Sequence, residues 1–179
     1  MKHQPYFLIF AAVLSIGGLI SGIMAWLFLP DAAAAQLHSY TAGQLQTIAD
    51  SYTWQEILQT IVTGNVMDML RVYLCGVCLV GIPIMVLFLF LKCFAVGFSV
   101  CILAQSSMVL LLSRLLYLPA LVFAVLIAYR FSLSLVQNTV QSPLRQLLQY
   151  TLMFLGILLC TLLVSGIDSL ANIYYLYRL

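Results

Sequence analysis

Long apolar stretches alternate with short polar ones along this chain, and the pattern predicts membrane-spanning helices. An α-helix rises about 1.5 Å per residue, so about 20 apolar residues cross the roughly 30 Å hydrocarbon core of a bilayer. The pattern predicts an all-α, polytopic transmembrane bundle that forms a single domain over residues 1–179. Its spans are expected at about residues 6–29, 70–91, 93–112, 115–136 and 147–167.

The first apolar run, Tyr6 to Leu29, has an alternative interpretation as a signal peptide. Ala32 to Ala35 offers small residues of the A-x-A type for cleavage. The run is longer than the usual apolar core of about 7 to 15 residues in signal peptides. An uncleaved first span is therefore favoured.

Residues 30–69 are more polar and contain acids but no Lys or Arg. Thr53 and Glu56 have the spacing of a capping box at a helix start, and a helix is expected to run from there to Gly64. We expect an extracytoplasmic amphipathic segment, whose helix binds a partner, lies in the membrane interface, or packs on its own bundle. The candidate partner-binding residues, which share one helical face, are Trp54, Ile57, Leu58 and Ile61.

The stretch from Thr63 to Val100 predicts a tight transmembrane hairpin. Lys92 is the charge that divides its two apolar halves, so the turn is expected there. Small residues let membrane helices approach each other closely. The residues expected to pack helices together in this way are Gly18, Gly22, Gly76, Gly81, Gly97 and Cys101.

Composition agrees with a membrane protein and excludes several other classes. Hydrophobic residues make up 64% of the chain and charged residues 7%, against roughly 25% charged in soluble domains. The net charge of +2 forms no dense basic face, so no nucleic-acid partner is expected. The five cysteines lie in apolar runs, where we expect no disulfide, and Cys75 and Cys78 lack the electropositive setting of a redox pair.

Motifs for catalysis are missing from the sequence. It contains no H-E-x-x-H, no Walker A and no G-x-G-x-x-G motif, and no histidine within a predicted span. We therefore expect a non-enzymatic protein without catalytic, cofactor-binding or metal sites. Arg114 and Asp168 are expected at the same membrane surface, where they form an ion pair or are hydrated separately.

The positions of Lys and Arg favour a cytoplasmic N-terminus and an outer C-terminus. Lys2, Lys92 and Arg145 then lie inside, and Arg130 lies near enough to snorkel to that side.

Several short motifs resemble the stage II sporulation protein M family. They are Asn65, Gly76, Gly81-Ile-Pro-Ile84, Phe90-Leu-Lys92-Cys93, Val96-Gly-Phe-Ser99, the stretches Leu118-Pro-Ala and Phe131-Ser, and Ile167-Asp168. Two departures stand out. Cys93 replaces a glycine expected after Lys92, and the segment between Gln105 and Pro119 is shorter than in the family.

This resemblance implies a membrane scaffold in endospore formation. Such a scaffold would hold peptidoglycan-degrading partners, the stage II sporulation proteins D and P, at the sporulation septum and the engulfing mother-cell membrane. Membrane lipid is the other expected partner, and self-association of the chain is left open. The alternative is the permease subunit of an exporter that resembles the ABC-2 type and requires a separate ATPase.

Overall fold

The computed structural model describes residues 4–51, 53–78, 81–104, 108–136 and 143–176, and these fold almost entirely into α-helices. The all-α prediction is confirmed. The helices within these ranges are α1 (Gln4–Leu27), α2 (Asp31–Ser51), α3 (Trp54–Val77), α4 (Gly81–Ala104), α5 (Met108–Val136) and α6 (Pro143–Leu176).

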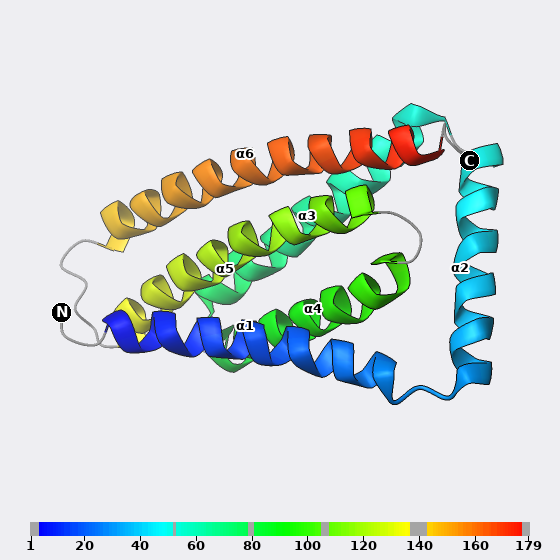
Figure 1. Cartoon of the computed structure of the whole chain (residues 1–179). Helices are drawn as coiled ribbons and strands as arrows, with labels where there is room; N and C mark the ends of the chain where they lie inside the picture. The colour runs from blue at the N-terminus through cyan, green and yellow to red at the C-terminus, as the bar shows by residue number, and fades with distance from the viewer. Residues whose placement is uncertain (1–3, 52, 79–80, 105–107, 137–142, 177–179) are drawn as a thin grey trace.

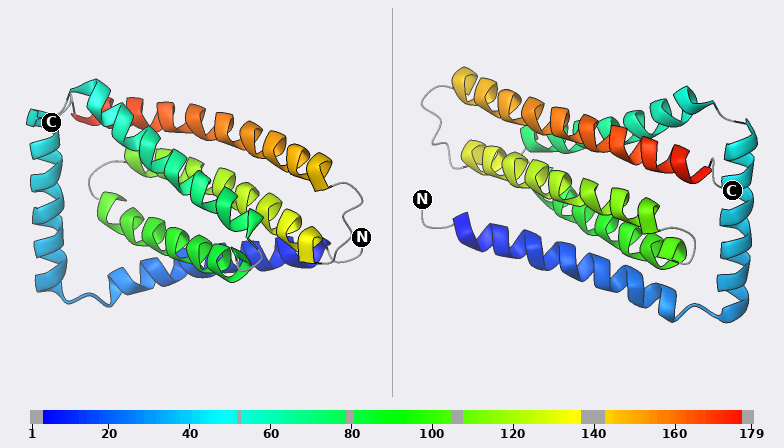
Figure 2. Two further views of the ribbon diagram at one scale, coloured as in Figure 1. Left: turned by 180° about the vertical axis from the view of Figure 1, so that it is seen from behind. Right: turned by 45° about the horizontal axis from the view of Figure 1, so that its top comes forward.

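Helices α1, α3, α4, α5 and α6 run along one another in a bundle, and each reverses the direction of the one before it in this series (Figure 1). Helix α2 lies across one end of the bundle, roughly perpendicular to the others, and both further views agree (Figure 2). The first helix starts at the opposite end, whereas α6 finishes at the end that α2 crosses.

Four stretches in the described part of the chain are long and apolar enough to cross a membrane, which makes this a multi-pass membrane protein. They lie in α1, α4, α5 and α6, at Phe7–Leu27, Gly81–Ile102, Leu115–Leu135 and Leu144–Ala171. Helix α3 runs the length of the bundle beside them but carries Glu56, Asp68 and Arg71. The described structure therefore has four apolar spans and one more polar helix within the same bundle.

The predicted turn at Lys92 is wrong, because Lys92 lies in the middle of α4. The chain reverses instead between α3 and α4, where the Gly81 N–H donates to the Cys78 carbonyl at 2.9 Å. A Cβ on Gly81 would lie 1.7 Å from the Cys75 carbonyl oxygen, so only glycine fits this position without rearrangement. The spans predicted at residues 70–91 and 93–112 are thereby replaced by α3 and α4.

Two further predicted boundaries are also wrong. The helix that begins at Trp54 continues through Gly64 to Val77, so residues 30–69 comprise α2 and the first part of α3. A single glycine lowers helix stability without ending a helix that is packed along its length. Arg114 lies within α5 and not in a connection, since arginine is a good helix former and one charge near a helix end does not interrupt it.

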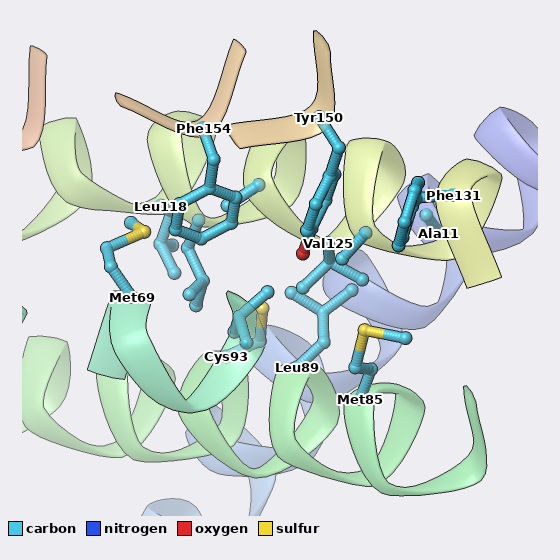
Figure 3. Packing of buried hydrophobic residues seen from close by; sticks show 14 residues of the cluster. Ala11, Met69, Met85, Leu89, Cys93, Leu118, Val125, Phe131, Tyr150 and Phe154 are labelled. Atoms are coloured by element: carbon cyan, nitrogen blue, oxygen red, sulfur yellow. The ribbon is translucent and has the colours of Figure 1, made fainter. Parts of the chain in front are cut away.

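One apolar core holds the bundle together (Figure 3). The cluster includes three almost completely buried side chains, Met69 from α3, Leu89 from α4 and Val125 from α5. Helix α1 contributes Ala11, and α6 contributes Phe154. The core thus joins all five lengthwise helices and leaves α2 outside it.

Candidate functional site

A buried charge lies between α3 and α4. The Asp68 side chain in α3 is 7% exposed, and its two carboxylate oxygens accept hydrogen bonds from two different cations. Oδ1 accepts from Nη1 of Arg71 at 3.0 Å, one turn along the same helix. Oδ2 accepts from Nζ of Lys92 in α4. We call Asp68, Arg71 and Lys92 the charged centre.

The charged centre lies near the middle of the bundle. Lys92 is the twelfth of the 22 residues in the apolar stretch Gly81–Ile102, so its partner Asp68 lies close to the same depth. A lone charge at the centre of a membrane helix costs roughly 2.5 to 3.5 kcal/mol on insertion scales. The Lys92 ammonium also lies 5.6 Å from the centroid of the Phe88 ring. Pairing with Asp68 explains how α4 carries a charge in mid-span.

Tyr117 of α5 brings a buried hydroxyl near this centre. Its hydroxyl is buried and has no hydrogen-bond partner among the described residues. It lies within electrostatic range of the Asp68 carboxylate. Burial of an unpaired hydroxyl in an apolar interior costs about 1 to 3 kcal/mol of folding free energy. A side chain needed only for packing would avoid this cost if it lacked the hydroxyl.

Polar side chains continue along the contact of α3 with α6. The Asn65 amide donates to Oγ of Ser165 at 2.8 Å, across 100 positions of sequence. Thr161, Ser165 and Ser169 are all fully buried, and each hydroxyl donates to the carbonyl four residues earlier in α6. The Asn65–Ser165 hydrogen bond joins the two helices, and the three buried hydroxyls are satisfied within α6.

Aromatic rings fill the other half of the same contact. Tyr150 of α6 stacks between Tyr73 of α3 and Phe131 of α5, with ring centroids 5.1 and 4.3 Å away. Its hydroxyl donates to the Tyr73 carbonyl at 3.0 Å. Gly76 makes room for it, since a Cβ there would lie 2.4 Å from the Tyr150 hydroxyl. Figure 3 shows Tyr150, Phe131 and Phe154 together on this side of the core.

The other glycines expected at helix contacts lie between α1 and α4. A Cβ on Gly22 would lie 2.2 Å from the Phe94 carbonyl oxygen, and one on Gly97 would lie 2.3 Å from that of Leu19. A Cβ on Gly18 would lie 2.8 Å from that of Cys93. Cys101 is half-buried, one turn beyond Gly97. The two backbones therefore touch where these glycines face each other.

The residues predicted to bind a partner lie in the first turns of α3, at the end of the bundle that α2 crosses. Trp54 is 57% exposed, whereas Ile57, Leu58 and Ile61 are half-buried. The Glu56 carboxylate accepts from the Thr53 backbone N–H at 2.8 Å and from its hydroxyl at 2.9 Å. These two hydrogen bonds, the backbone one first, lower the pKa of Glu56.

Helix α2 makes few contacts with the bundle. The Trp26 ring of α1 meets His38 of α2 edge to face, with ring centroids 5.2 Å apart, and meets Phe98 of α4 at 5.6 Å. Tyr40 of α2 is exposed. The ring of Trp26 thus connects the first half of α2, at His38, to α1.

The predicted pairing of Arg114 with Asp168 falls on a residue, Arg114, whose side chain lies outside the described part of the chain. Asp168 is half-buried in α6, and its pairing with Arg114 stays a prediction. All five cysteines are free thiols. Within the described residues, no group of three His, Cys, Asp or Glu side chains is placed to hold a metal ion.

Sequence reasoning missed the pairing of Asp68 with Lys92. Both residues lie in largely apolar stretches, are opposite in sign and are 24 positions apart. That complementarity was the available signal. A lysine in a turn at the membrane surface needs no such partner, so the predicted turn at Lys92 does not point to Asp68.

Comparison with protein families identifies a family model that matches the chain. The family model described as stage II sporulation protein M matches residues 6–167, which is most of the chain. Comparisons with curated proteins and with solved structures gave no match. The matched range begins in α1 and ends in α6, so it includes the charged centre and the glycine contacts. The chain belongs to the stage II sporulation protein M family.

Proposed function

We propose that this protein is a non-enzymatic membrane scaffold of the engulfment complex, which holds peptidoglycan-degrading partners at the sporulation septum. The expected partners are the stage II sporulation proteins D and P. Family membership supports a role in sporulation. The structural observation that carries the proposal is the surface formed by α2 and the start of α3 at one end of the bundle.

This end surface has the geometry that a scaffold needs. Because α2 lies across the lengthwise helices, it runs roughly parallel to the plane of a membrane that those helices cross (Figure 2). Helix α2 is also more polar than the spans. The end surface exposes two aromatic rings, Tyr40 of α2 and Trp54 of α3. Aromatic side chains supply a large share of binding energy at protein interfaces. A partner outside the bilayer would reach them without displacing the bundle.

Purification of the tagged chain from sporulating cells tests the proposal. We expect peptidoglycan hydrolases to be recovered with the wild type and to be several-fold reduced with the double variant Trp54→Ala/Ile57→Ser. Leu163→Ala is a matched control, since Leu163 is exposed on α6 within an apolar span, far from the end surface in sequence. That variant should recover partners as the wild type does.

The same experiment separates the scaffold from the alternative, a permease subunit. Recovery of an ATPase without a hydrolase would overturn the scaffold and favour an exporter. Equal hydrolase recovery with Trp54→Ala/Ile57→Ser would remove the end surface from the proposal.

A further inference from the structure

The charged centre contains more positive than negative charge, and the excess is exposed on the side of the bundle. Asp68 supplies one negative charge for both Arg71 and Lys92. The Arg71 side chain is 66% exposed, against 35% for Lys92 and 7% for Asp68. Within the described residues, only Nη1 of the Arg71 guanidinium has a hydrogen-bond partner, although the group carries five N–H donors.

The surroundings of Arg71 are apolar and also exposed. Met67, Leu70 and Leu74 are between 46% and 55% exposed on the same helix. Since Asp68 binds Lys92 in mid-span, Arg71 lies within about one helical turn of that depth. A cation there faces hydrocarbon unless another group covers it. Exposed charges within membrane helices are rare and mark functional contacts.

The chain itself does not supply a second acid at this depth. Asp31 and Asp50 lie in α2, and Glu56 lies in the first turn of α3, all at the far end of the bundle. Asp168 lies in the last third of α6, toward that same end. A second copy would bring only its own Asp68 to the right depth, and that carboxylate already binds two cations. Charge complementarity therefore points to a different protein.

We propose that Arg71, together with Met67, Leu70 and Leu74, forms a docking face for a transmembrane helix of another protein that carries a carboxylate near its middle. An Arg guanidinium and a carboxylate form two parallel hydrogen bonds, which fix both the depth and the rotation of the incoming helix. The apolar neighbours supply the van der Waals contact that drives helix association in lipid. The inference rests on the proposed function, since it describes how a scaffold would select a membrane-anchored partner.

Synthetic transmembrane peptides test the docking face. The purified full chain is reconstituted in phosphatidylcholine vesicles with a Leu/Ala helix of about 23 residues, long enough to span the bilayer, that carries one central Glu. A matched peptide carries Gln instead. Energy transfer between a donor on the chain and an acceptor on the peptide reports association. We expect the Glu peptide to associate about tenfold more tightly than the Gln peptide.

Substitutions at Arg71 supply the decisive comparison. Arg71→Lys retains the charge and should retain most of the preference for Glu, whereas Arg71→Gln should reduce the ratio to near one. Arg130→Gln is the matched control, because Arg130 is an exposed arginine on α5 and its loss should leave the ratio unchanged. Thermal unfolding of each variant in detergent shows whether the bundle is intact. Asp68 and Lys92 still pair in Arg71→Gln, so we expect it to fold.

Two results would overturn the docking face. Equal association of both peptides with the wild type would mean that Arg71 does not select an acidic helix, and an unchanged ratio in Arg71→Gln would mean that another residue selects the acid. The purification from sporulating cells separates this proposal from the scaffold. Equal hydrolase recovery by the wild type and Arg71→Gln would contradict the docking face but not the scaffold. Failure of the wild type to recover any hydrolase would contradict the scaffold.

Discussion

Helix α4 is held on two sides by different physical means. Toward α1 it presents Gly97, and the backbones touch because neither helix places a side chain between them. Toward α3 it presents Lys92, whose charge is neutralised by Asp68. The first contact depends on shape and the second on charge. Dispersion contacts in a membrane are available to any well-fitting helix, whereas an ion pair specifies one partner.

The two contacts therefore have different roles in the assembly of the bundle. The glycine contact brings α1 and α4 close over about one turn of α1, from Gly18 to Gly22. The ion pair fixes which part of α3 lies beside which part of α4, since the carboxylate of Asp68 cannot be shifted by a turn without leaving Lys92 unpaired. Close fit at the glycines brings the backbones of α1 and α4 together, and the ion pair sets the register of α3 against α4.

Loss of the Asp68 charge should have the largest effect on stability. Asp68→Asn keeps the shape of the side chain but leaves Lys92 uncompensated in mid-span. We expect a loss of roughly 3 kcal/mol, at the lower end for a broken buried pair, because Lys92 is 35% exposed. Thermal unfolding in mild detergent and the cellular level of the protein measure it. The double variant Asp68→Asn/Lys92→Gln should recover at least half of the loss, and purely additive effects would show that the two residues are not coupled.

A methyl group in the glycine contact should have the next largest effect. In Gly22→Ala the new Cβ would lie 2.2 Å from the Phe94 carbonyl oxygen, so α1 must move away from α4. Overpacking of this kind costs roughly 1 to 3 kcal/mol. Gly17→Ala is the control in the same helix, because no heavy atom of the surroundings lies within 4 Å of its Cβ position. Equal unfolding temperatures for the two variants would contradict a backbone contact at Gly22.

Acid pH should have the smallest effect, at the start of α3 and away from both contacts. Hydrogen bonds from the Thr53 N–H and hydroxyl hold the pKa of Glu56 below its ordinary value of 4.5. The carboxylate therefore stabilises the helix start above that ordinary value, and this contribution is lost as the pH falls through the lowered pKa of the folded state. Amide hydrogen exchange in the first turn of α3 should become a few-fold faster, after correction for the intrinsic rate. Glu56→Gln should show no such pH dependence.

Local patterns predicted much of the fold. Apolar length identified α1, α5 and α6 as membrane helices, and the Thr53 to Glu56 spacing located the start of α3, whereas α4 was divided between two predicted spans. These features depend on neighbouring residues, whose spacing is visible in the sequence. Small residues likewise marked Gly22 and Gly97 before their contact was known, because close approach in lipid requires them.

The turn and the charged centre could not be obtained in the same way. A charge in an apolar run indicates a helix end only if it is unpaired, and the partner of Lys92 lies in another helix. A turn at Lys92 makes Gly81 a packing residue in the prediction, whereas in the structure the chain reverses at Gly81. The contact between Asn65 and Ser165, 100 positions apart, is equally invisible to local spacing. The partners of charges and amides in membrane helices can be assigned only when the three-dimensional arrangement of the helices is known.

The ion pair between α3 and α4 also bears on how the chain enters the membrane. Helix α3 is made before α4 and is not among the stretches that are apolar enough to cross by themselves. The short reversal at Gly81 makes the two helices neighbours as soon as both have been synthesised. We therefore expect α3 and α4 to be inserted as one unit. Asp68 of α3 then pairs with Lys92 as soon as α4 has been synthesised.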